Sequence, residues 1–182
     1  MSFVPDMPQT QAKWFRMGDL KHRPDGSCTV RFITDVVTGL EKWTEANKPV
    51  RVSLGEAFPA GVKWRKGEDG VEEPPKVFMA AGVHNVTDDI EQVWTWTQKK
   101  FHTRLKAKMA RFKGDPKDAA ITVTRLDTKP VDYDVDVEKA EPYTPEQKAR
   151  IEALLGEWTG PVALIGNGDP WKPFGEDDVP AF

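Results

Sequence analysis

Short apolar and β-branched segments separated by polar turns run through the first third of the chain, and they predict β-strands. Two extended segments, residues 14–17 and 29–33, flank the sequence Pro24-Asp25-Gly26. Proline presets φ for a turn and glycine accepts the left-handed position, so this tripeptide predicts a tight turn. Residues 49–54 alternate between apolar and polar side chains, the two-residue period of a half-buried strand. Residues 66–75, rich in glycine, proline and acids, predict a solvated loop.

The middle of the chain carries the clearest pattern. Residues 76–83 are an apolar segment, and residues 90–97 are dense in β-branched and aromatic side chains, which are enriched in strands. A turn is predicted between them at residues 85–89. The two segments therefore predict neighbouring strands.

From residue 98 to residue 113 the period changes from that of a strand to that of a helix. Apolar residues recur there at steps of four and three: Phe101, Leu105, Met109 and Phe112. Gly114-Asp115-Pro116 ends this predicted helix. Two further alternating strands follow at residues 119–125 and 132–137.

This order of elements predicts a mainly β fold, a five-stranded OB-like Greek-key barrel with one interposed helix. An α+β sandwich with a similar strand order would give much the same pattern. A second helix is predicted to begin at Thr144, because threonine can cap, Pro145 suits the first helical position and Gln147 can complete a capping box. The predicted organisation is a flexible arm (1–13), an OB domain (14–140), a C-terminal helix (141–158) and an acidic disordered tail (159–182).

Charge is distributed unevenly along the chain. The formal net charge is −3, but residues 1–130 hold 22 Lys and Arg against 17 Asp and Glu, a net charge of +5. Residues 131–182 hold 4 against 12, a net charge of −8. A basic body with an acidic end is typical of proteins that bind an anionic partner.

The predicted helix at residues 98–113 is the most basic segment. It contains seven cations and no acid: Lys99, Lys100, Arg104, Lys106, Lys108, Arg111 and Lys113. Surface helices usually mix both signs, because opposite charges three or four residues apart stabilise them. A polyanion would relieve the repulsion among these cations, and the alternative is a solvated basic face.

The chain also contains seven tryptophans. Trp43 and Trp64 each lie next to a lysine, which suits an exposed ring on which a base stacks while the cation binds phosphate. Trp94 and Trp96 lie on the same face of a predicted central strand, and we expect them in the core. Phe78 is a weaker candidate for stacking.

Nothing in the sequence favours catalysis, a metal site or a membrane span. One cysteine, Cys28, and three separated histidines do not make a conventional zinc site. The row Asp132, Asp134 and Asp136 on one strand face is more typical of a solvated surface than of a Mg²⁺ site. No apolar run approaches the length of a membrane span and no secretory signal is visible. We therefore expect a cytoplasmic protein without a cofactor.

The last seven residues combine acids with a short apolar tip. Glu176-Asp177-Asp178 precede Val179-Pro180-Ala181-Phe182. A basic pocket on a partner protein can capture such a carboxylate and ring together, and the acids can also compete with DNA for basic groups of the same chain.

Several short motifs resemble those of phage single-stranded DNA-binding proteins with a single OB fold. The motifs, in the order in which that family has them, are Thr97-Gln98-Lys99, Gly114-Asp115-Pro116, Ile121-Thr122-Val123-Thr124-Arg125 and Tyr133-Asp134-Val135. Val30-Arg31-Phe32 and Trp43 are similar to the opening strand and the aromatic residue of the family. The final residues are similar to the acidic tip of bacterial single-stranded DNA-binding proteins. The resemblance implies an OB fold and a non-catalytic role in DNA replication or recombination.

We therefore expect non-catalytic, sequence-independent binding of single-stranded DNA during phage replication or recombination; a groove that stacks bases would accept RNA as well. The residues expected to bind phosphate are Arg51, Arg65, Lys66, Lys99, Lys100, Arg104 and Arg125. Those expected to stack on bases are Trp43, Trp64 and Phe78. Those expected to recruit replication proteins are Asp177, Asp178, Val179, Pro180 and Phe182. The alternatives are a protein–protein adaptor that docks an acidic partner and a nuclease of the same replication module.

Overall fold

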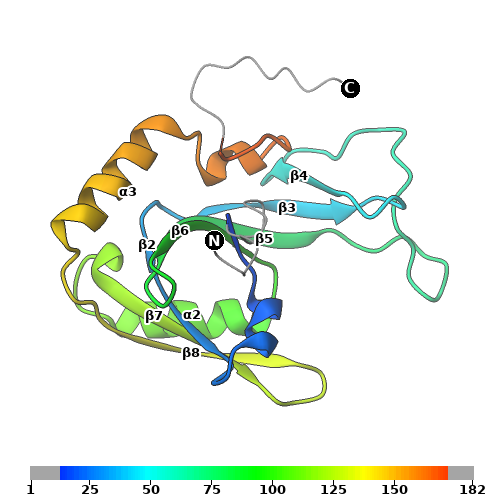
Figure 1. Cartoon of the computed structure of the whole chain (residues 1–182). Helices are drawn as coiled ribbons and strands as arrows, with labels where there is room; N and C mark the ends of the chain where they lie inside the picture. The colour runs from blue at the N-terminus through cyan, green and yellow to red at the C-terminus, as the bar shows by residue number, and fades with distance from the viewer. Residues whose placement is uncertain (1–12, 172–182) are drawn as a thin grey trace, which may run out of the picture.

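The computed structural model describes residues 13–171, which form an eight-stranded sheet with two main helices (Figure 1). The strands are β1 (Trp14–Phe15), β2 (Ser27–Phe32), β3 (Val37–Trp43), β4 (Pro49–Ser53), β5 (Lys76–Asn85), β6 (Ile90–Trp96), β7 (Ala119–Leu126) and β8 (Asp132–Lys139). The α-helices are α2 (Lys99–Arg111) and α3 (Pro145–Glu157). Three short 3-10 helices are η1 (Met17–His22), η2 (Pro116–Asp118) and η3 (Pro161–Leu164).

Strand β5 is the branch point of the sheet. The strand order is β1-β6-β5-β2-β7-β8, and β3 also pairs with β5 and carries β4 on its other side. One edge of β5 therefore binds β6, while the opposite edge binds β3 along its first half and β2 at its end. The β1–β6 pair is parallel and the other pairs are antiparallel. We call β3 and β4, which extend away from the rest of the sheet, the β3–β4 arm.

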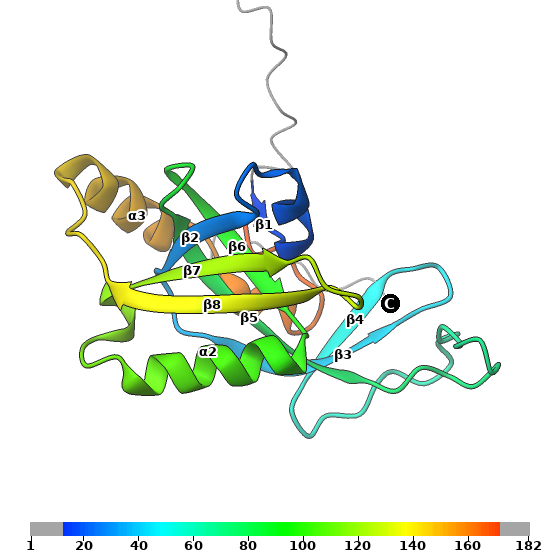
Figure 2. The same cartoon turned by 90° about the horizontal axis from the view of Figure 1, so that it is seen from below.

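The prediction of a mainly β, five-stranded closed barrel is wrong. The described sheet is open, mixed and eight-stranded, so the class is mixed α/β. A barrel needs its edge strands to pair, but the outer edge of β8 lies beside α2 (Figure 2). Arg104 of α2 donates to the main-chain carbonyl of Tyr133 on β8 at 2.5 Å, and Phe101 and Leu105 pack in the same apolar cluster as Tyr133 and Val135. The helix thus covers the edge at which a strand would have to pair.

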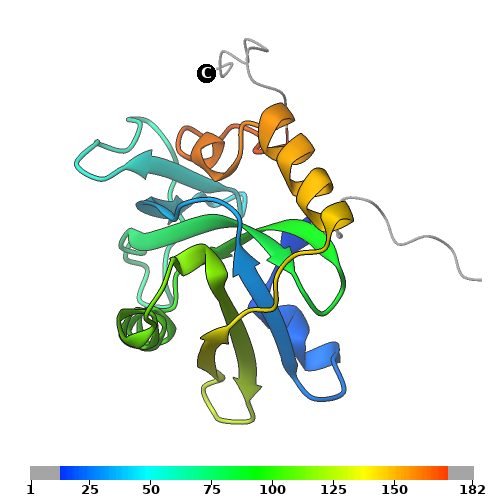
Figure 3. The ribbon, with the colours of Figure 1, turned by 90° about the vertical axis from the view of Figure 1, so that its left-hand side faces the viewer.

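Two apolar clusters lie on opposite faces of the sheet. Because side chains alternate along a strand, β5 contributes to both. On one face its residues join Trp94, Trp96 and the apolar side of α2. On the other face its residues join α3, Trp158 and η3. Figure 3 shows α2 on one side of the layer of β3 and β5, and η3 on the other.

The C-terminal part of the described chain is more ordered than the sequence predicts. The capping box of Thr144 and Gln147 at the start of α3 is confirmed. Residues 159–171, which the sequence predicts to belong to a disordered tail, instead include η3, and Leu164 is only 3% exposed. Residues 172–182, with the predicted partner-binding tip, lie outside the described residues. Within residues 13–171, neither α2 nor α3 is long and apolar enough to cross a membrane.

Gly39 allows η3 and the β3–β4 arm to pack closely, and its substitution tests this packing. A Cβ at residue 39 would lie 2.6 Å from the carbonyl oxygen of Val52 and 2.7 Å from Cδ1 of Ile165. We expect Gly39→Ala to lower the free energy of unfolding by about 1–3 kcal/mol, because a packed site must move to accept the methyl group. Urea unfolding followed by circular dichroism measures this change.

Gly156 in α3 provides the matched control. A Cβ there would meet nothing within 4 Å, and alanine is favoured over glycine inside a helix by roughly 0.5–1 kcal/mol. Gly156→Ala should therefore raise the stability slightly. A Gly39→Ala variant as stable as the parent chain would contradict the close packing.

Candidate nucleic-acid interface

The cations of α2 divide into two groups. Arg104 and Lys108 face β8 and form ion pairs with Asp132 at 2.9 Å and with Asp136 at 2.8 Å. The amide of Tyr133 and the Arg104 guanidinium both bind the Asp132 carboxylate and hold its pKa below its usual value. The other cations of the helix remain exposed: Lys99, Lys100, Lys106 and Arg111. Part of the positive charge predicted for DNA therefore fixes the helix to the edge strand.

Arg125, at the end of β7, belongs to the same side of the molecule as these cations. It lies opposite Tyr133 in the β7–β8 pair, next to the segment that Arg104 contacts. The N-terminal end of α2 and the end of β7 point to the same end of the molecule (Figure 2). The elements at this end of the molecule therefore carry four predicted phosphate ligands, Lys99, Lys100 and Arg104 on α2 and Arg125 on β7.

Glu41 organises a second group of predicted residues on the β3–β4 arm. Its buried carboxylate accepts from the indole Nε1 of Trp43 at 2.9 Å and from Nε of Arg51 at 2.8 Å. The Arg65 guanidinium lies 5.5 Å from the centre of the Trp43 ring and forms two hydrogen bonds with Glu73. Trp43, Arg51 and Arg65 are therefore neighbours, as a binding surface requires.

Two of the rings predicted to stack on bases are not accessible. Phe78 is fully buried, with the Arg51 guanidinium 5.2 Å from its ring centre. Trp64 is 9% exposed and packs edge-to-face against Phe58. Both rings contribute to packing, so the expectation that they stack on bases is corrected. Lys66 is exposed in the loop beyond Trp64.

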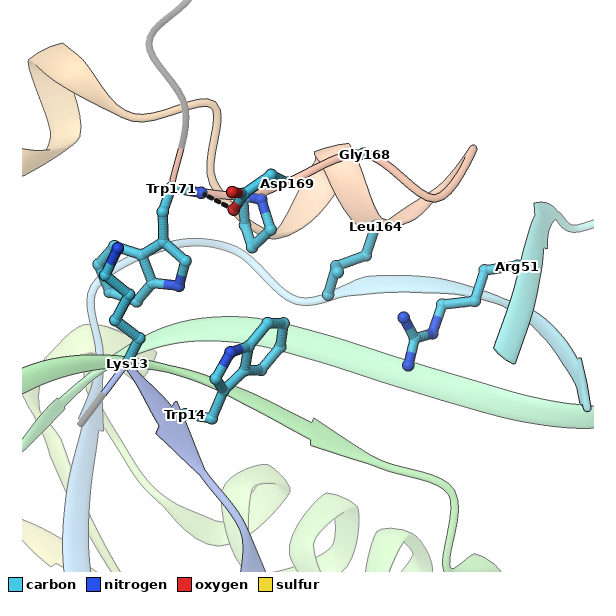
Figure 4. Close-up of a pocket in the computed structure, with 8 residues that line it drawn as sticks. Lys13, Trp14, Arg51, Leu164, Gly168, Asp169 and Trp171 are labelled. Carbon is cyan, nitrogen blue, oxygen red and sulfur yellow. Dashed lines mark hydrogen bonds between the residues drawn. The ribbon is translucent and has the colours of Figure 1, made fainter. Parts of the chain in front are cut away.

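A pocket of about 340 Å³ lies next to Arg51, between the first described residues and the last ones (Figure 4). Trp14 and Trp171 line it together with Lys13 and Arg51. The Lys13 ammonium lies 5.6 Å from the centre of the Trp171 ring, and Trp171 packs against buried Trp158 at 4.7 Å between ring centres. Two half-buried indoles and two cations thus meet at one pocket.

Arg51 links the pocket to the arm, because it lines the pocket and binds Glu41, the carboxylate that also accepts from Trp43. We call the whole surface the indole–cation strip, and its members are Lys13, Trp14, Trp43, Arg51, Arg65 and Trp171. Of the seven tryptophans, four are buried and the other three all lie on this strip.

The sequence analysis missed three members of the strip: Lys13, Trp14 and Trp171. The signal that selected Trp43, a cation adjacent to a tryptophan, is also present in Lys13-Trp14 and Trp171-Lys172. The first pair opens a predicted strand and the second falls in the predicted tail, so neither stands near the other candidates in the sequence.

The predicted phosphate and base ligands do not form one cleft. Arg51 contacts Phe78 in the cluster beneath η3, whereas α2 covers the other cluster. The strip and the basic face of α2 therefore lie on opposite sides of the β3 and β5 layer (Figure 3). A ligand short enough to bind one of these surfaces does not contact the other.

Within the described residues, no group of three or more His, Cys, Asp and Glu side chains is placed to hold a metal ion. Comparison of the chain with models of protein families, with curated proteins and with solved structures gives no match. The site must therefore be interpreted from its own residues.

The Glu41 contacts can be tested by removing one charge. We expect Glu41→Gln to lower the free energy of unfolding by about 1–3 kcal/mol, because Arg51 is left without a carboxylate in a largely buried position. Thermal unfolding measures this change, and Trp43 fluorescence should respond because the indole loses its charged acceptor. Glu45→Gln is the control on the same arm, since Glu45 is exposed and such surface changes stay within about 0.5 kcal/mol. Equal losses in the two variants would contradict the organising role of Glu41.

Proposed function

We propose that the protein binds single-stranded DNA, without sequence preference and without catalysis, along the indole–cation strip. The observation that supports this proposal is that the three tryptophans that are not buried, Trp14, Trp43 and Trp171, all lie on the strip with its cations. Single-stranded DNA offers the complementary chemistry, since its bases have π faces that stack on indoles and its phosphates attract cations.

The dimensions and composition of the strip suit this ligand. The pocket beside Trp14 and Trp171 has a volume of about 340 Å³, within the range of about 300–1,000 Å³ of small-ligand sites. A base can stack on an indole whatever its identity, so stacking gives affinity without sequence preference. Lys13 lies beside Trp171 and Arg65 beside Trp43, so these cations would attract the phosphates between stacked bases.

The biological role we propose follows the resemblance to phage proteins: protection of single-stranded DNA in replication or recombination in the cytoplasm of a host cell. In this role the acidic residues 176–182 would recruit replication proteins. The exposed lysines of α2, Lys99 and Lys100, remain predicted phosphate ligands for DNA that reaches the opposite face.

Titration of the full chain with oligo-dT tests the proposal. We expect quenching of tryptophan fluorescence and an affinity that falls as salt rises, because phosphate contacts release counterions. Trp43→Leu and Trp171→Leu keep apolar bulk but remove the indole. Each should weaken binding by about 1–3 kcal/mol, the contribution of one stacked base.

The matched control replaces charge on the other face. Lys99→Gln with Lys100→Gln should leave the affinity for a short oligo-dT nearly unchanged if the strip is the site. If the double variant loses affinity and the tryptophan variants do not, the binding site is on α2 and not on the strip. A protein–protein adaptor would show no quenching in any variant, and a nuclease would cleave the oligonucleotide when Mg²⁺ is added.

The tail can be tested by ending the chain after Gly175, which removes three acids and the apolar tip but leaves Trp171 in place. We expect the shortened chain to bind oligo-dT more tightly, since fewer carboxylates compete with phosphate for the cations. The same fluorescence titration at low salt measures the effect. Charge-neutral replacement of Glu176, Asp177 and Asp178 by Gln and Asn separates charge from length. Unchanged affinity in both variants would exclude competition by the tail.

A further inference from the structure

A second cavity, of about 490 Å³, lies on the α3 side of the sheet beneath the segment that links β8 to α3. Its lining includes Arg31 of β2, His84 of β5 and Tyr143 of the linking segment. Arg31 and His84 are directly opposite each other in the β2–β5 pair. The side chains of Arg31 and His84 therefore line the same cavity.

Arg31 is an unusual buried cation, because it has no hydrogen-bonded carboxylate within the described residues. It is 5% exposed, and its terminal nitrogens donate to the main-chain carbonyls of Glu141 at 2.7 Å and Lys117 at 3.2 Å. The nearest carboxylate, that of exposed Asp118, lies 3.8 Å away. The Nε atom of Arg31 is buried without a partner. Burying a charge is costly unless it is paired and hydrogen-bonded, and the one ion pair of this guanidinium within the described residues is a long contact with an exposed carboxylate.

Tyr143 adds a second unmet polar group to the same cavity. Its ring centre lies 3.6 Å from the Arg31 guanidinium carbon and 5.3 Å from the centre of the His84 ring. Its hydroxyl is buried and has no partner among the described residues. Burial raises the pKa of this hydroxyl above its usual value, so at neutral pH it carries its proton and can donate it in a hydrogen bond.

The surroundings of the cavity are fixed by contacts that leave these two donors free. Nδ1 of His84 lies 3.0 Å from a carboxylate oxygen of Glu91. Arg150 of α3 binds Glu91 at 2.8 Å and Asp89 at 2.9 Å. These contacts attach α3 to β6 and to the β5–β6 turn. The cavity therefore keeps its shape without using Arg31 Nε or the Tyr143 hydroxyl.

We propose that this cavity binds the phosphate group of a small ligand, with Arg31 Nε and the Tyr143 hydroxyl donating to two phosphate oxygens. An oxyanion gives the guanidinium a negatively charged partner. Its oxygens also accept hydrogen bonds from the two donors, which have no acceptor. Glu138 and Glu141 at the rim are exposed, so water screens them, and Lys139 at the same rim opposes their charge. The volume of the cavity accommodates more than a free phosphate, and a nucleoside monophosphate is the organic form to test first.

The experiment follows the Arg31 Nε–H signal by NMR in the full chain while sodium phosphate replaces sodium chloride at constant ionic strength. We expect a saturable shift of this signal in the parent chain. Tyr143→Phe keeps the ring stacked on Arg31 and removes only the hydroxyl. It should weaken phosphate binding roughly tenfold or more, the usual effect of losing a hydrogen bond to a charged group.

Tyr133→Phe is the matched control, because Tyr133 is a buried tyrosine of the other cluster, and it should bind phosphate like the parent chain. Thymidine monophosphate and thymidine, added in the same way, distinguish an organic phosphate from free phosphate as the source. An unmoved Nε–H signal, or a shift that does not saturate and is equal in Tyr143→Phe, would overturn the proposal and leave the cavity to water. The site does not depend on the indole–cation strip, so a failed oligo-dT titration leaves this test intact.

Discussion

Burial of β5 on both faces is the constraint on which the rest of the structure depends. From Phe78 onward every residue of this strand is buried, so the sheet must be covered on both sides. Helix α2 covers one face, and α3 with η3 covers the other. The layer of α3 and η3 brings Trp171 beside Trp14 and Arg51. The same layer also closes the cavity that Arg31 lines. Both candidate sites are thus consequences of a strand that cannot face water.

The same constraint explains why α2 lies where a barrel would close. A helix with one apolar side and many cations needs an apolar surface and nearby acids. Strand β8 offers both, because its inward residues are apolar while Asp132 and Asp136 alternate with them. Once the helix occupies this edge, the backbone groups of β8 cannot pair with another strand. The acids that resemble a metal site in the sequence therefore serve to position the helix.

Local patterns in the sequence predict many of the elements but not their assembly. The strands β5 to β8 and the helices α2 and α3 lie close to their predicted bounds, because their periodicity and caps are local signals. β3 was missed, since Gly39 weakens its pattern, and that glycine is required by contacts with residues far away in sequence. The pocket escaped prediction for the same reason: Lys13 and Trp171 are separated by nearly the whole described chain, and only the packing of η3 brings them together.

The indole–cation strip and the basic face of α2 differ in how many of their cations already have a carboxylate partner. Arg51 and Arg65 on the strip are hydrogen-bonded to Glu41 and Glu73, whereas the exposed lysines of α2 belong to a helix without an acid. A cation that already has a carboxylate partner releases fewer counterions on meeting phosphate than a free lysine does. If the strip binds DNA as we propose, its indoles would supply much of an affinity that falls only moderately as salt rises, and α2 would supply the more salt-sensitive part. Because the two surfaces lie on opposite faces, only DNA long enough to pass around the molecule can contact both of them. The salt dependence of binding should therefore increase with the length of the bound strand.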